Sequence, residues 1–581
     1  MSFKQTPTKT KHTQAGDCHS LGVLCFATCA ANGKQYEMFF YISTKANTYT
    51  PAKTIYVCAP DKDAHSYESV EKFAKESRWL ELAEDDGAVL VMPVAKNGWQ
   101  ALKPTLIEEL YDETRKNFRS KNGDSIPGRN GFVWCWETLI YLVGYGEGAV
   151  FAGNVTVTSP NRFAGVALVG GVPCDYTAQS NPSSHWLVHN VSPDYNMRNH
   201  DIPVCLWMFG PNENFVKEAL AYFSESNQIA APAELKEYEG ISTKLYKNSR
   251  EEAAQIRVSV GNFSATPVLA KTIMNQFFNK FILWKNSPDG TLKPYLNKSA
   301  FYDSDRYAHD SVMMNDIKYE FSTYLPEGMN YKDAAGLHVV FSVHGRGEPS
   351  WIFSTKNAWD RLADETKEFI LVLPDSPQNI WLFDRDGEVF QHIIDKLYEI
   401  YSIDKSRVYL TGFSNGGMIT RQVGNHYPEL FAAISPWNAP FADSFEEILL
   451  SGYELPCFIC AGDNDDKVPL WDDLDSLLEN MLKINNCSIR EAGIRSPMKF
   501  IPDDVHNGEN HYTQENKYTD GERFQTFLYN NSYGQARVCF TLMKNMPHGA
   551  VYDESRATWA FMKRFSRPEG SKKVVNAEFK S

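Results

Sequence analysis

A serine, an aspartate and a histidine that together could cleave an acyl bond occur in that order in the second half of the chain. Ser414 lies in Gly412-Phe413-Ser414-Asn415-Gly416, which matches the pattern GxSxG. A serine hydroxyl is a weak nucleophile near neutral pH and needs a base that is itself held by an acid. A strand is expected over 407–411 and a helix over 416–426, so the serine lies in the strand–turn–helix context that the pattern requires. We therefore predict that Ser414 is a nucleophile at a tight turn, rather than part of a glycine-rich helix start.

The acid and the base are expected on loops that follow later strands of the same sheet. Asp465 comes after the strand expected over 457–461, and His548 lies between a strand expected over 538–542 and a helix expected over 554–565. We predict that His548 takes the Ser414 proton and that Asp465 holds the imidazole. The alternatives are Asp463 and Asp466 for the acid, and His506 and His511, in a polar stretch typical of a loop, for the base.

A glycine-rich segment offers backbone donors for the negative charge that such a reaction develops. His344-Gly345-Arg346-Gly347 follows the strand expected over 337–343. Gly345 allows the backbone to approach closely, and the N–H groups of Arg346 and Asn415 are predicted to form an oxyanion hole. We interpret His344 itself as a structural hydrogen-bonding residue. The alternative is a plain glycine turn.

The elements that must position these residues alternate between strand and helix. Short β-branched runs, typical of buried parallel strands, alternate with stretches of helical periodicity. The expected strands cover 337–343, 369–373, 407–411, 431–435, 457–461 and 538–542, and the expected helices cover 358–365, 388–401, 416–426 and 554–565. This alternation predicts an α/β fold with a mostly parallel sheet covered by helices on both faces.

The first half of the chain repeats the pattern of the second. Tyr141-Leu-Val-Gly144-Tyr-Gly146-Glu-Gly148 matches Tyr409-Leu-Thr-Gly412-Phe-Ser414-Asn-Gly416, and Phe163-Ala164 matches Phe431-Ala432, each 268 residues later. One constant offset over an ordered set of matches indicates a duplication. The predicted organisation is a flexible arm at 1–18, a first domain at 19–285, a linker at 286–312, a second domain at 313–567 with an insertion at about 485–534, and a tail at 568–581.

The second half resembles the α/β-hydrolase superfamily, and more narrowly the polyhydroxybutyrate depolymerase and feruloyl esterase group. The resemblance covers about 315–565 and rests on Val343-His344-Gly345-Arg346-Gly347, Trp359-Asp-Arg-Leu362-Ala363 and Gly412-Phe-Ser414-Asn-Gly-Gly417-Met. It implies two tandem α/β-hydrolase-like domains, the second of which cleaves carboxylic esters through an acyl-enzyme, without a cofactor. In this group a cysteine often stands where this chain has Arg346, which indicates a different substrate pocket.

The first copy lacks the residues that carry the chemistry. Gly146 stands in place of Ser414, Ala59-Pro60 in place of His344-Gly345, Glu213 at the acid position and Ser264 at the base position. We predict a non-catalytic domain that acts as a scaffold, a dimer surface or a substrate-docking module. Gly144-x-Gly146-x-x-Ala149 also fits a relaxed dinucleotide-binding pattern, but the constant offset favours a relic of the serine turn.

The amino-acid composition excludes or disfavours several classes of protein and of function. The chain has 581 residues, 43% of them hydrophobic and 22% charged, as in a folded globular protein. Its formal net charge of −14 disfavours nucleic-acid binding as the main function. No apolar run is long enough for a membrane span. The one CxxC, Cys457-Phe-Ile-Cys460, has no second pair to complete a metal site, and buried reduced thiols favour a cytoplasmic location.

Two features bear on the substrate. Trp381 and Trp437 lie just beyond strand ends, and we interpret them as pocket-lining residues or as core. The insertion at about 485–534 is polar and aromatic, and it is predicted either to fold over Ser414 as a flap or to form a surface hairpin. The expected substrate is a small or oligomeric ester, and the expected protein partner is a second copy bound through the first domain. The alternatives are a serine peptidase or amidase with the same three residues, and a non-catalytic binding protein.

Overall fold

The chain forms two compact units in the computed structural model, the first ending at Tyr295 and the second occupying the described residues from 298 onward. The structure describes residues 11–14, 21–31, 34–46, 51–110, 135–183, 197–248, 253–284, 291–295, 298–329, 336–439, 445–463, 465, 467–468, 470–487, 524–543 and 546–577.

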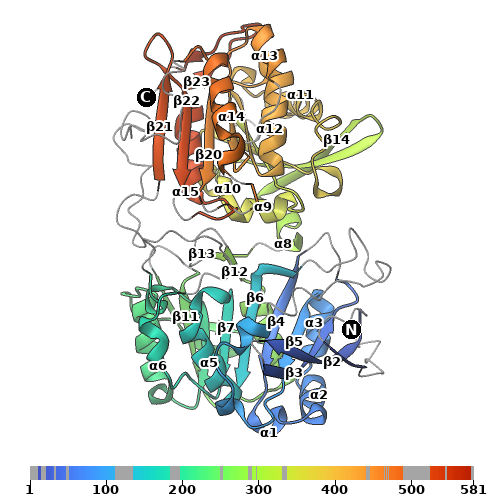
Figure 1. Ribbon diagram of the computed structural model, residues 1–581, viewed down its shortest axis with the longest axis vertical. Coiled ribbons are helices and arrows are strands. Elements are labelled where there is room, and N and C mark those ends of the chain that lie inside the picture. The colour runs from blue at the N-terminus through green and yellow to red at the C-terminus, as the bar shows by residue number, and fades with distance from the viewer. Residues whose placement is uncertain are drawn as a thin grey trace. The chain divides into compact units, whose positions relative to one another are not determined.

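In the described part of unit 1, eleven strands form one sheet in the order β1-β2-β3-β5-β4-β6-β7-β8-β11-β10-β9 (Figure 1). The neighbouring strands β5, β4, β6, β7, β8 and β11 run parallel to one another. β3, β10 and β9 run antiparallel to their neighbours. The strands are β1 (Lys11–Gln14), β2 (Leu24–Ala31), β3 (Lys34–Ile42), β4 (Ala52–Cys58), β5 (Val89–Pro93), β6 (Cys135–Tyr145), β7 (Gly165–Val169), β8 (Leu206–Gly210), β9 (Glu234–Tyr238), β10 (Ile241–Lys247) and β11 (Gln255–Val260).

Helices cover both faces of this sheet. On one face α5 packs against β6 and β7, and α6 packs against β8 and β11; α2, α3 and α7 lie on the other face. The helices are α1 (Asp61–Ala64), α2 (Tyr67–Glu76), α3 (Trp79–Asp86), α5 (Glu147–Thr158), α6 (Glu213–Ser226) and α7 (Pro267–Ile273). A short antiparallel pair, β12 (Phe281–Trp284) and β13 (Thr291–Pro294), follows them.

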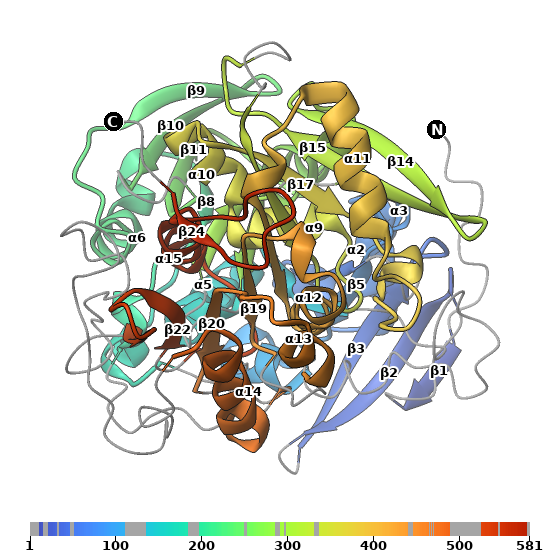
Figure 2. The same cartoon turned by 90° about the horizontal axis from the view of Figure 1, so that it is seen from above.

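Unit 2 is built on nine described strands in the order β14-β15-β17-β16-β18-β19-β20-β22-β21. The neighbouring strands β17, β16, β18, β19, β20 and β22 run parallel to one another. The antiparallel hairpin of β14 and β15 lies at one edge of the sheet, beside α11 (Figure 2). The strands are β14 (Tyr307–Met314), β15 (Ile317–Tyr324), β16 (His338–Val343), β17 (Phe369–Pro374), β18 (Val408–Phe413), β19 (Ala433–Trp437), β20 (Cys457–Gly462), β21 (Phe524–Asn530) and β22 (Ala536–Met543).

The helices of unit 2 again cover both faces of the sheet. α11, α12 and α14 pack on one face, and α9, α10 and α15 on the other. They are α8 (Lys298–Tyr302), α9 (Ser350–Asn357), α10 (Trp359–Thr366), α11 (Val389–Tyr401), α12 (Asn415–His426), α13 (Glu446–Ser451), α14 (Leu470–Ile484) and α15 (Tyr552–Met562). Within the described residues, no helix combines the length and the apolar character needed to cross a membrane.

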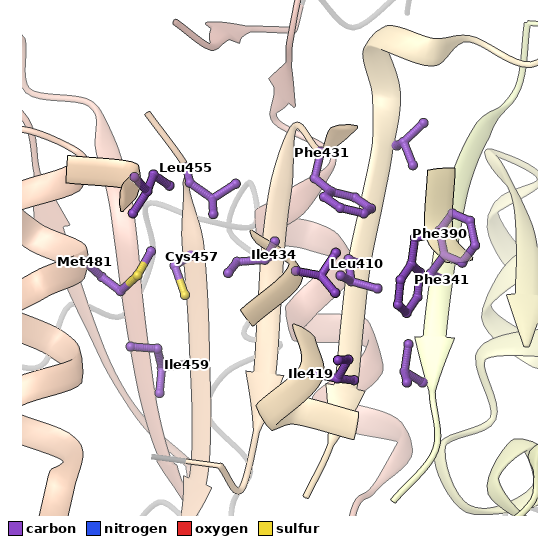
Figure 3. Close-up of a cluster of buried hydrophobic side chains, with 14 of the residues drawn as sticks. Phe341, Phe390, Leu410, Ile419, Phe431, Ile434, Leu455, Cys457, Ile459 and Met481 are labelled. Atoms are coloured by element: carbon purple, nitrogen blue, oxygen red, sulfur yellow. The ribbon is translucent and has the colours of Figure 1, made fainter. Parts of the chain in front are cut away.

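The core between the first helix layer and the sheet is a continuous cluster of aliphatic and aromatic side chains. Phe341, Leu410 and Ile434 come from adjacent strands, and Phe390 and Ile419 from the helices above them (Figure 3). All five are at most 1% exposed. Because burial of such side chains is the main driving force for folding, this layer fixes α12 on the sheet and with it the turn that precedes the helix.

Nine strands follow the same order in both units: β2-β3-β5-β4-β6-β7-β8-β11-β10 corresponds to β14-β15-β17-β16-β18-β19-β20-β22-β21. The two units also share a buried hydrogen bond from a tyrosine on the middle strand. Tyr141 donates to the carbonyl of Phe281 at 2.6 Å, and Tyr409 donates to the carbonyl of Phe565 at 2.7 Å. The predicted fold class, two α/β units each with a mostly parallel sheet between helices, is therefore confirmed.

Three segments predicted to be irregular contain regular structure. β1 lies in the predicted arm at 1–18 and pairs with β2. β13, α8 and the start of β14 lie in the predicted linker at 286–312, and β24 (Val575–Asn576) lies in the predicted tail at 568–581, where it pairs with β23 (Phe565–Ser566). These polar segments carry no hydrophobic periodicity, and the strands among them form because a neighbouring strand offers backbone hydrogen bonds.

The described free cysteines are almost all buried. Cys58, Cys205, Cys457, Cys460, Cys487 and Cys539 are buried free thiols, and Cys174 is exposed. Burial raises the pKa of each of the thiols of Cys58, Cys205, Cys457, Cys460 and Cys539. Cys25 on β2, by contrast, is disulfide-bonded. Because disulfides are typical of oxidising compartments, the expected cytoplasmic location is not supported.

Candidate active site

Ser414 occupies a strained turn between β18 and α12. β18 ends at Phe413 and α12 begins at Asn415, so only the serine lies between them. Its backbone has φ 55° and ψ −120°, a conformation that residues with a Cβ rarely adopt. The Ser414 N–H donates to the carbonyl of Trp437 at 2.9 Å, and its carbonyl accepts from the N–H of Met418 at 2.9 Å. These two bonds hold the turn between β19 and the first turn of α12.

A glycine after the serine lets α12 lie directly against the end of β16. A Cβ at Gly416 would lie 2.3 Å from the backbone oxygen of Val343 and 2.5 Å from that of His344. No larger residue fits without moving the backbone. The N-terminal end of α12, which carries a partial positive charge, is therefore fixed beside the serine hydroxyl.

The structure brings Ser414, His548 and Asp465 into one line of contacts. Nε2 of His548 lies 2.9 Å from Oγ of Ser414, and Nδ1 lies 2.7 Å from Oδ2 of Asp465. The other carboxylate oxygen of Asp465 accepts the N–H groups of Lys467 and Val468, both at 2.9 Å. The Asp465 side chain is 2% exposed and the His548 side chain 16%. With the proton on Nδ1, the imidazole donates to a fixed, buried carboxylate and presents Nε2 to the hydroxyl.

Two backbone N–H groups, in the segments that follow β16 and β18, have no acceptor among the described residues. They belong to Asn415, the first residue of α12, and to Arg346. The loop that carries Arg346 is fixed by hydrogen bonds from Gly347 N–H to the carbonyl of Asn379 (2.6 Å) and from Glu348 N–H to the carbonyl of Gly345 (3.3 Å). The Arg346 side chain is exposed. Backbone N–H groups without an acceptor are the donors that an oxyanion hole requires.

Asn415 is held by its own side chain. Its Oδ1 accepts the N–H of Trp381 at 2.8 Å, and its Nδ2 donates to the carbonyl of Trp381 at 3.2 Å. The Trp381 indole N–H donates in turn to the carbonyl of His344 at 3.1 Å. Trp381 therefore links the loop after β17 to both segments that carry the free donors.

Of the two interpretations given for Trp381 and Trp437, pocket lining or core, the burial of both side chains agrees with core. Trp381 is 1% exposed and Trp437 is fully buried. The Trp437 indole N–H donates to Ser435 Oγ at 2.8 Å and to Thr558 Oγ1 at 3.0 Å, and its ring stacks on Trp359. Both indoles find polar partners inside the protein, so their position at a strand end does not require contact with solvent.

His344 is fully buried and makes hydrogen bonds to its own loop and to the loop after β17. Its Nδ1 lies 2.7 Å from the carbonyl of Gly345, and its Nε2 accepts the N–H of Ser376 at 3.1 Å. Burial lowers the pKa of His344, which keeps the ring neutral with its proton on Nδ1. The geometry agrees with the interpretation of His344 as a structural residue.

Two residues that support the histidine were not singled out from the sequence. Asn438, the residue after β19, donates through Nδ2 to the carbonyl of Gly549 at 3.1 Å and so fixes the loop that carries His548. The ring of Phe413 lies 4.7 Å from the imidazole, centroid to centroid. Phe413 was visible as the variable residue of the pentapeptide, but neither contact has a sequence signal of its own.

Among the competing residues, Asp463 lies in the part of the chain that the structure describes. Asp463 is exposed and donates its N–H to the carbonyl of Met543. Asp466, His506 and His511 lie outside the described residues. Of the predicted insertion at about 485–534, β21 forms the edge strand beside β22, while residues 488–523 lie outside the described residues. The flap therefore stays a prediction.

Unit 1 keeps the turn without the hydroxyl. Gly146 lies between β6 and α5 with φ 56° and ψ −123°, within 3° of the angles of Ser414. Trp99 donates its indole N–H to the carbonyl of Ala59 at 2.8 Å, as Trp381 does to His344. Glu213 is exposed at the start of α6 and pairs with Lys244, and Ser264 is exposed. The backbone scaffold is thus repeated while the reactive side chains are absent from these positions.

A mostly parallel sheet, a serine at a strand–turn–helix junction, and an acid and a histidine after later strands occur together in one superfamily. Unit 2 has the α/β-hydrolase fold. The predicted resemblance is supported by the order of Ser414 after β18, Asp465 after β20 and His548 after β22.

Comparison with known proteins points the same way at low identity. No protein-family model matches the chain. The chain is 28% identical over 177 residues to a bifunctional acetylxylan esterase/xylanase of Neocallimastix patriciarum, a match that covers 29% of this chain and 25% of that protein. It is 33% identical over 125 residues to feruloyl esterase B of Neurospora crassa, covering 19% of this chain and 40% of that protein. It is also similar to poly(3-hydroxyalkanoate) depolymerase C of Paucimonas lemoignei, 25% identical over 173 residues that cover 26% of this chain and 37% of that protein.

The chain thus spans less than half the length of each of these three relatives. Among solved structures, an acetyl xylan esterase from Aspergillus awamori is 14% identical with a TM-score of 0.32, covering 44% of this chain and 99% of that chain. A feruloyl esterase module from Clostridium thermocellum is 14% identical with a TM-score of 0.31, covering 44% of this chain and 86% of that chain. Structural likeness at this level carries no argument about function.

Proposed function

We propose that the chain is a serine hydrolase that cleaves carboxylic esters at Ser414. The observation that carries this proposal is the line of contacts from Asp465 through His548 to Ser414, at 2.7 and 2.9 Å, on a strained turn. Sequence relatives named as esterases and as a depolymerase support the ester specificity. The reaction needs no cofactor.

Acylation begins when Ser414 Oγ attacks the ester carbonyl and its proton passes to Nε2 of His548. The carbonyl oxygen becomes an oxyanion, which the N–H groups of Asn415 and Arg346 stabilise. Asp465 stabilises the imidazolium through Nδ1–H without taking its proton. His548 then gives the proton from Nε2 to the leaving alkoxide, so that the alcohol departs and the acyl group stays on Ser414.

Deacylation repeats these steps with water. His548 takes a proton from a water molecule as that water attacks the acyl carbonyl, and the same two N–H groups hold the second oxyanion. Collapse breaks the bond to Ser414 Oγ, which regains a proton from Nε2. The carboxylic acid is released and the enzyme returns to its starting state.

Unit 1 is proposed to be non-catalytic. Gly146 has no hydroxyl, and Pro60, in the segment that corresponds to His344-Gly345, has no N–H to donate. Its retained turn and strand order suit a scaffold, a surface for a second copy of the chain, or a module that docks the substrate.

The proposal is tested with a fluorophosphonate probe followed by peptide mapping, beside a substrate panel. The panel contains aryl acetates and butyrates, methyl ferulate, acetylated xylan, 3-hydroxybutyrate oligomers and peptide amides, because the relatives' names point to the first groups and a peptidase would favour the last. We expect modification of Ser414, ester turnover, and loss of both in Ser414→Ala. Modification at another residue, or wild-type turnover by Ser414→Ala, would refute the assignment. A folded protein without label or turnover would favour a binding protein.

A further inference from the structure

A lysine is buried beneath the candidate active site. Lys356, near the end of α9, is 4% exposed. Its Nζ lies 3.0 and 3.3 Å from the two carboxylate oxygens of Glu348, and 3.7 Å from the centroid of the Phe413 ring. An ammonium group inside a protein is unfavourable unless it is paired, so the pair and the aromatic face are what make this position tolerable.

The partners of Lys356 belong to the segments that carry the proposed chemistry. Glu348 lies two residues after Arg346, and its backbone N–H closes the same loop onto the carbonyl of Gly345. Phe413 directly precedes Ser414, and its ring packs on His548. A single side chain therefore joins the loop that carries Arg346 to Phe413, the residue that precedes the nucleophile and packs on the imidazole.

Carboxyl groups from two further segments, the loop after β20 and helix α15, act on the same ammonium. Burial lowers the pKa of Lys356, while the negative charge of Glu348, of Asp465 and of Glu554 in its ionised form opposes that shift. Glu554 lies on α15, the helix that follows the loop of His548, and its carboxyl accepts the N–H of Val551. α9 and α15 are also joined directly, because Ser555 Oγ donates to the carbonyl of Asn357 at 2.8 Å.

We propose that Lys356 is a positioning residue, whose ion pair with Glu348 and contact with Phe413 hold the Arg346 loop, the Ser414 turn and the His548 ring in their mutual geometry. This rests on the proposed function. In this proposal Lys356 acts through its contacts with Glu348 and Phe413. Because oxyanion contacts tighten only in the transition state, its loss lowers kcat rather than raising KM.

The test is a double-mutant cycle with Lys356→Met, Glu348→Gln and the two combined. We expect kcat for an aryl ester to fall about 10- to 100-fold in each single variant, with KM within about threefold, since an error of about 1 Å in a catalytic group costs about 100-fold. The combined variant is expected to lose no more than the worse single variant, because the two residues act as one pair. It also removes the unpaired buried charge that could prevent Lys356→Met from folding.

A matched control comes from unit 1, where Lys53 is 2.8 and 2.9 Å from the carboxylate oxygens of Asp86 in another largely buried pair. Lys53→Met is expected to lower the melting temperature and to leave kcat unchanged. A purely structural role for Lys356 would give the same result as this control: a folded variant, or the folded combined variant, with kcat within twofold of wild type, or an effect on KM alone, overturns the proposal.

Fluorophosphonate labelling separates this outcome from failure of the proposed function. If the positioning role is correct, Lys356→Met labels Ser414 more slowly than wild type but to completion. If wild-type protein shows no labelling at Ser414, the proposed function itself fails, and the positioning role fails with it. If labelling of Ser414 is equally fast in wild type and in folded Lys356→Met, only the positioning role fails.

Discussion

The shared backbone angles at Ser414 and Gly146 lead to a reciprocal prediction about stability. A residue with a Cβ at φ near 55° and ψ near −120° is strained by about 1–3 kcal/mol, whereas glycine adopts the conformation freely. Ser414→Gly should therefore stabilise unit 2 relative to Ser414→Ala, which keeps the strain but lacks the hydroxyl. Gly146→Ala should destabilise unit 1.

The magnitude follows from the surroundings of each turn. A Cβ at Gly146 would meet nothing closer than Pro60 Cβ at 3.6 Å, an ordinary contact, so no clash adds to the strain. Alanine has less conformational entropy than glycine in the unfolded chain, which returns about 0.4–1 kcal/mol. We expect Gly146→Ala to lower the free energy of unfolding of unit 1 by about 1–2 kcal/mol. The free energy of unfolding of unit 2 should be higher in Ser414→Gly than in Ser414→Ala by a similar amount.

Urea denaturation of the full chain, with scanning calorimetry beside it, measures both effects. A difference of about 1 kcal/mol corresponds to a shift in melting temperature of about 2–4 °C for a unit of this size. None of the variants at Ser414 should hydrolyse ester, and Gly146→Ala should keep wild-type kcat. The reasoning is refuted if Gly146→Ala is neutral or stabilising while Ser414→Gly is no more stable than Ser414→Ala.

Two further predictions concern the acid residues of unit 2. Asp465→Asn should lower kcat by about 10⁴-fold with little change in KM, because an amide no longer fixes the imidazole tautomer. The control is Asp463→Asn, at an exposed residue, which should keep a kcat near wild type. Steady-state kinetics with an aryl ester measures both, and an Asp465→Asn variant that keeps a tenth of the wild-type kcat contradicts the role of Asp465. Burial raises the pKa of Glu554 from 4.5 to about 8. The unfolded chain therefore releases this proton at a lower pH than the folded chain does. The free energy of unfolding then falls as pH rises from about 4.5 to 8, by up to about 1.4 kcal/mol per pH unit. Glu554→Gln should flatten that fall between pH 6 and 8 in urea denaturation, unlike the exposed Glu569→Gln, and an unchanged slope would disprove the shift.

Much of the scaffold could be predicted because its determinants are local. The strand expected over 337–343 is observed as His338–Val343, and the helix expected over 416–426 as Asn415–His426. A buried parallel strand is a short apolar run and a surface helix has a 3.6-residue period, so both leave a clear pattern. The turn at Ser414 was readable because the adjacent Gly416 is required by a backbone contact that no other residue permits.

The rest depends on contacts between distant segments. Trp437 is the last residue of β19 and Trp381 lies in the loop after β17, and whether such an indole faces solvent or core depends on hydrogen-bond partners such as His344 and Thr558. Lys356 lies in α9, for which the sequence predicted no element, and its role arises only from its contacts with Glu348 and Phe413 in the folded chain. One-dimensional patterns contain no information about such contacts.

Alkylation of the buried cysteines can report which of the two units unfolds, because each unit contains buried thiols of its own. In the native state an alkylating reagent should reach Cys174 first among the described free cysteines, because the others are buried. Cys58 and Cys205 become accessible only when unit 1 opens, and Cys457, Cys460, Cys487 and Cys539 only when unit 2 opens. The mass that alkylation adds to each cysteine-containing peptide during a denaturant pulse would therefore report the two unfolding events separately, without any engineered label or substitution.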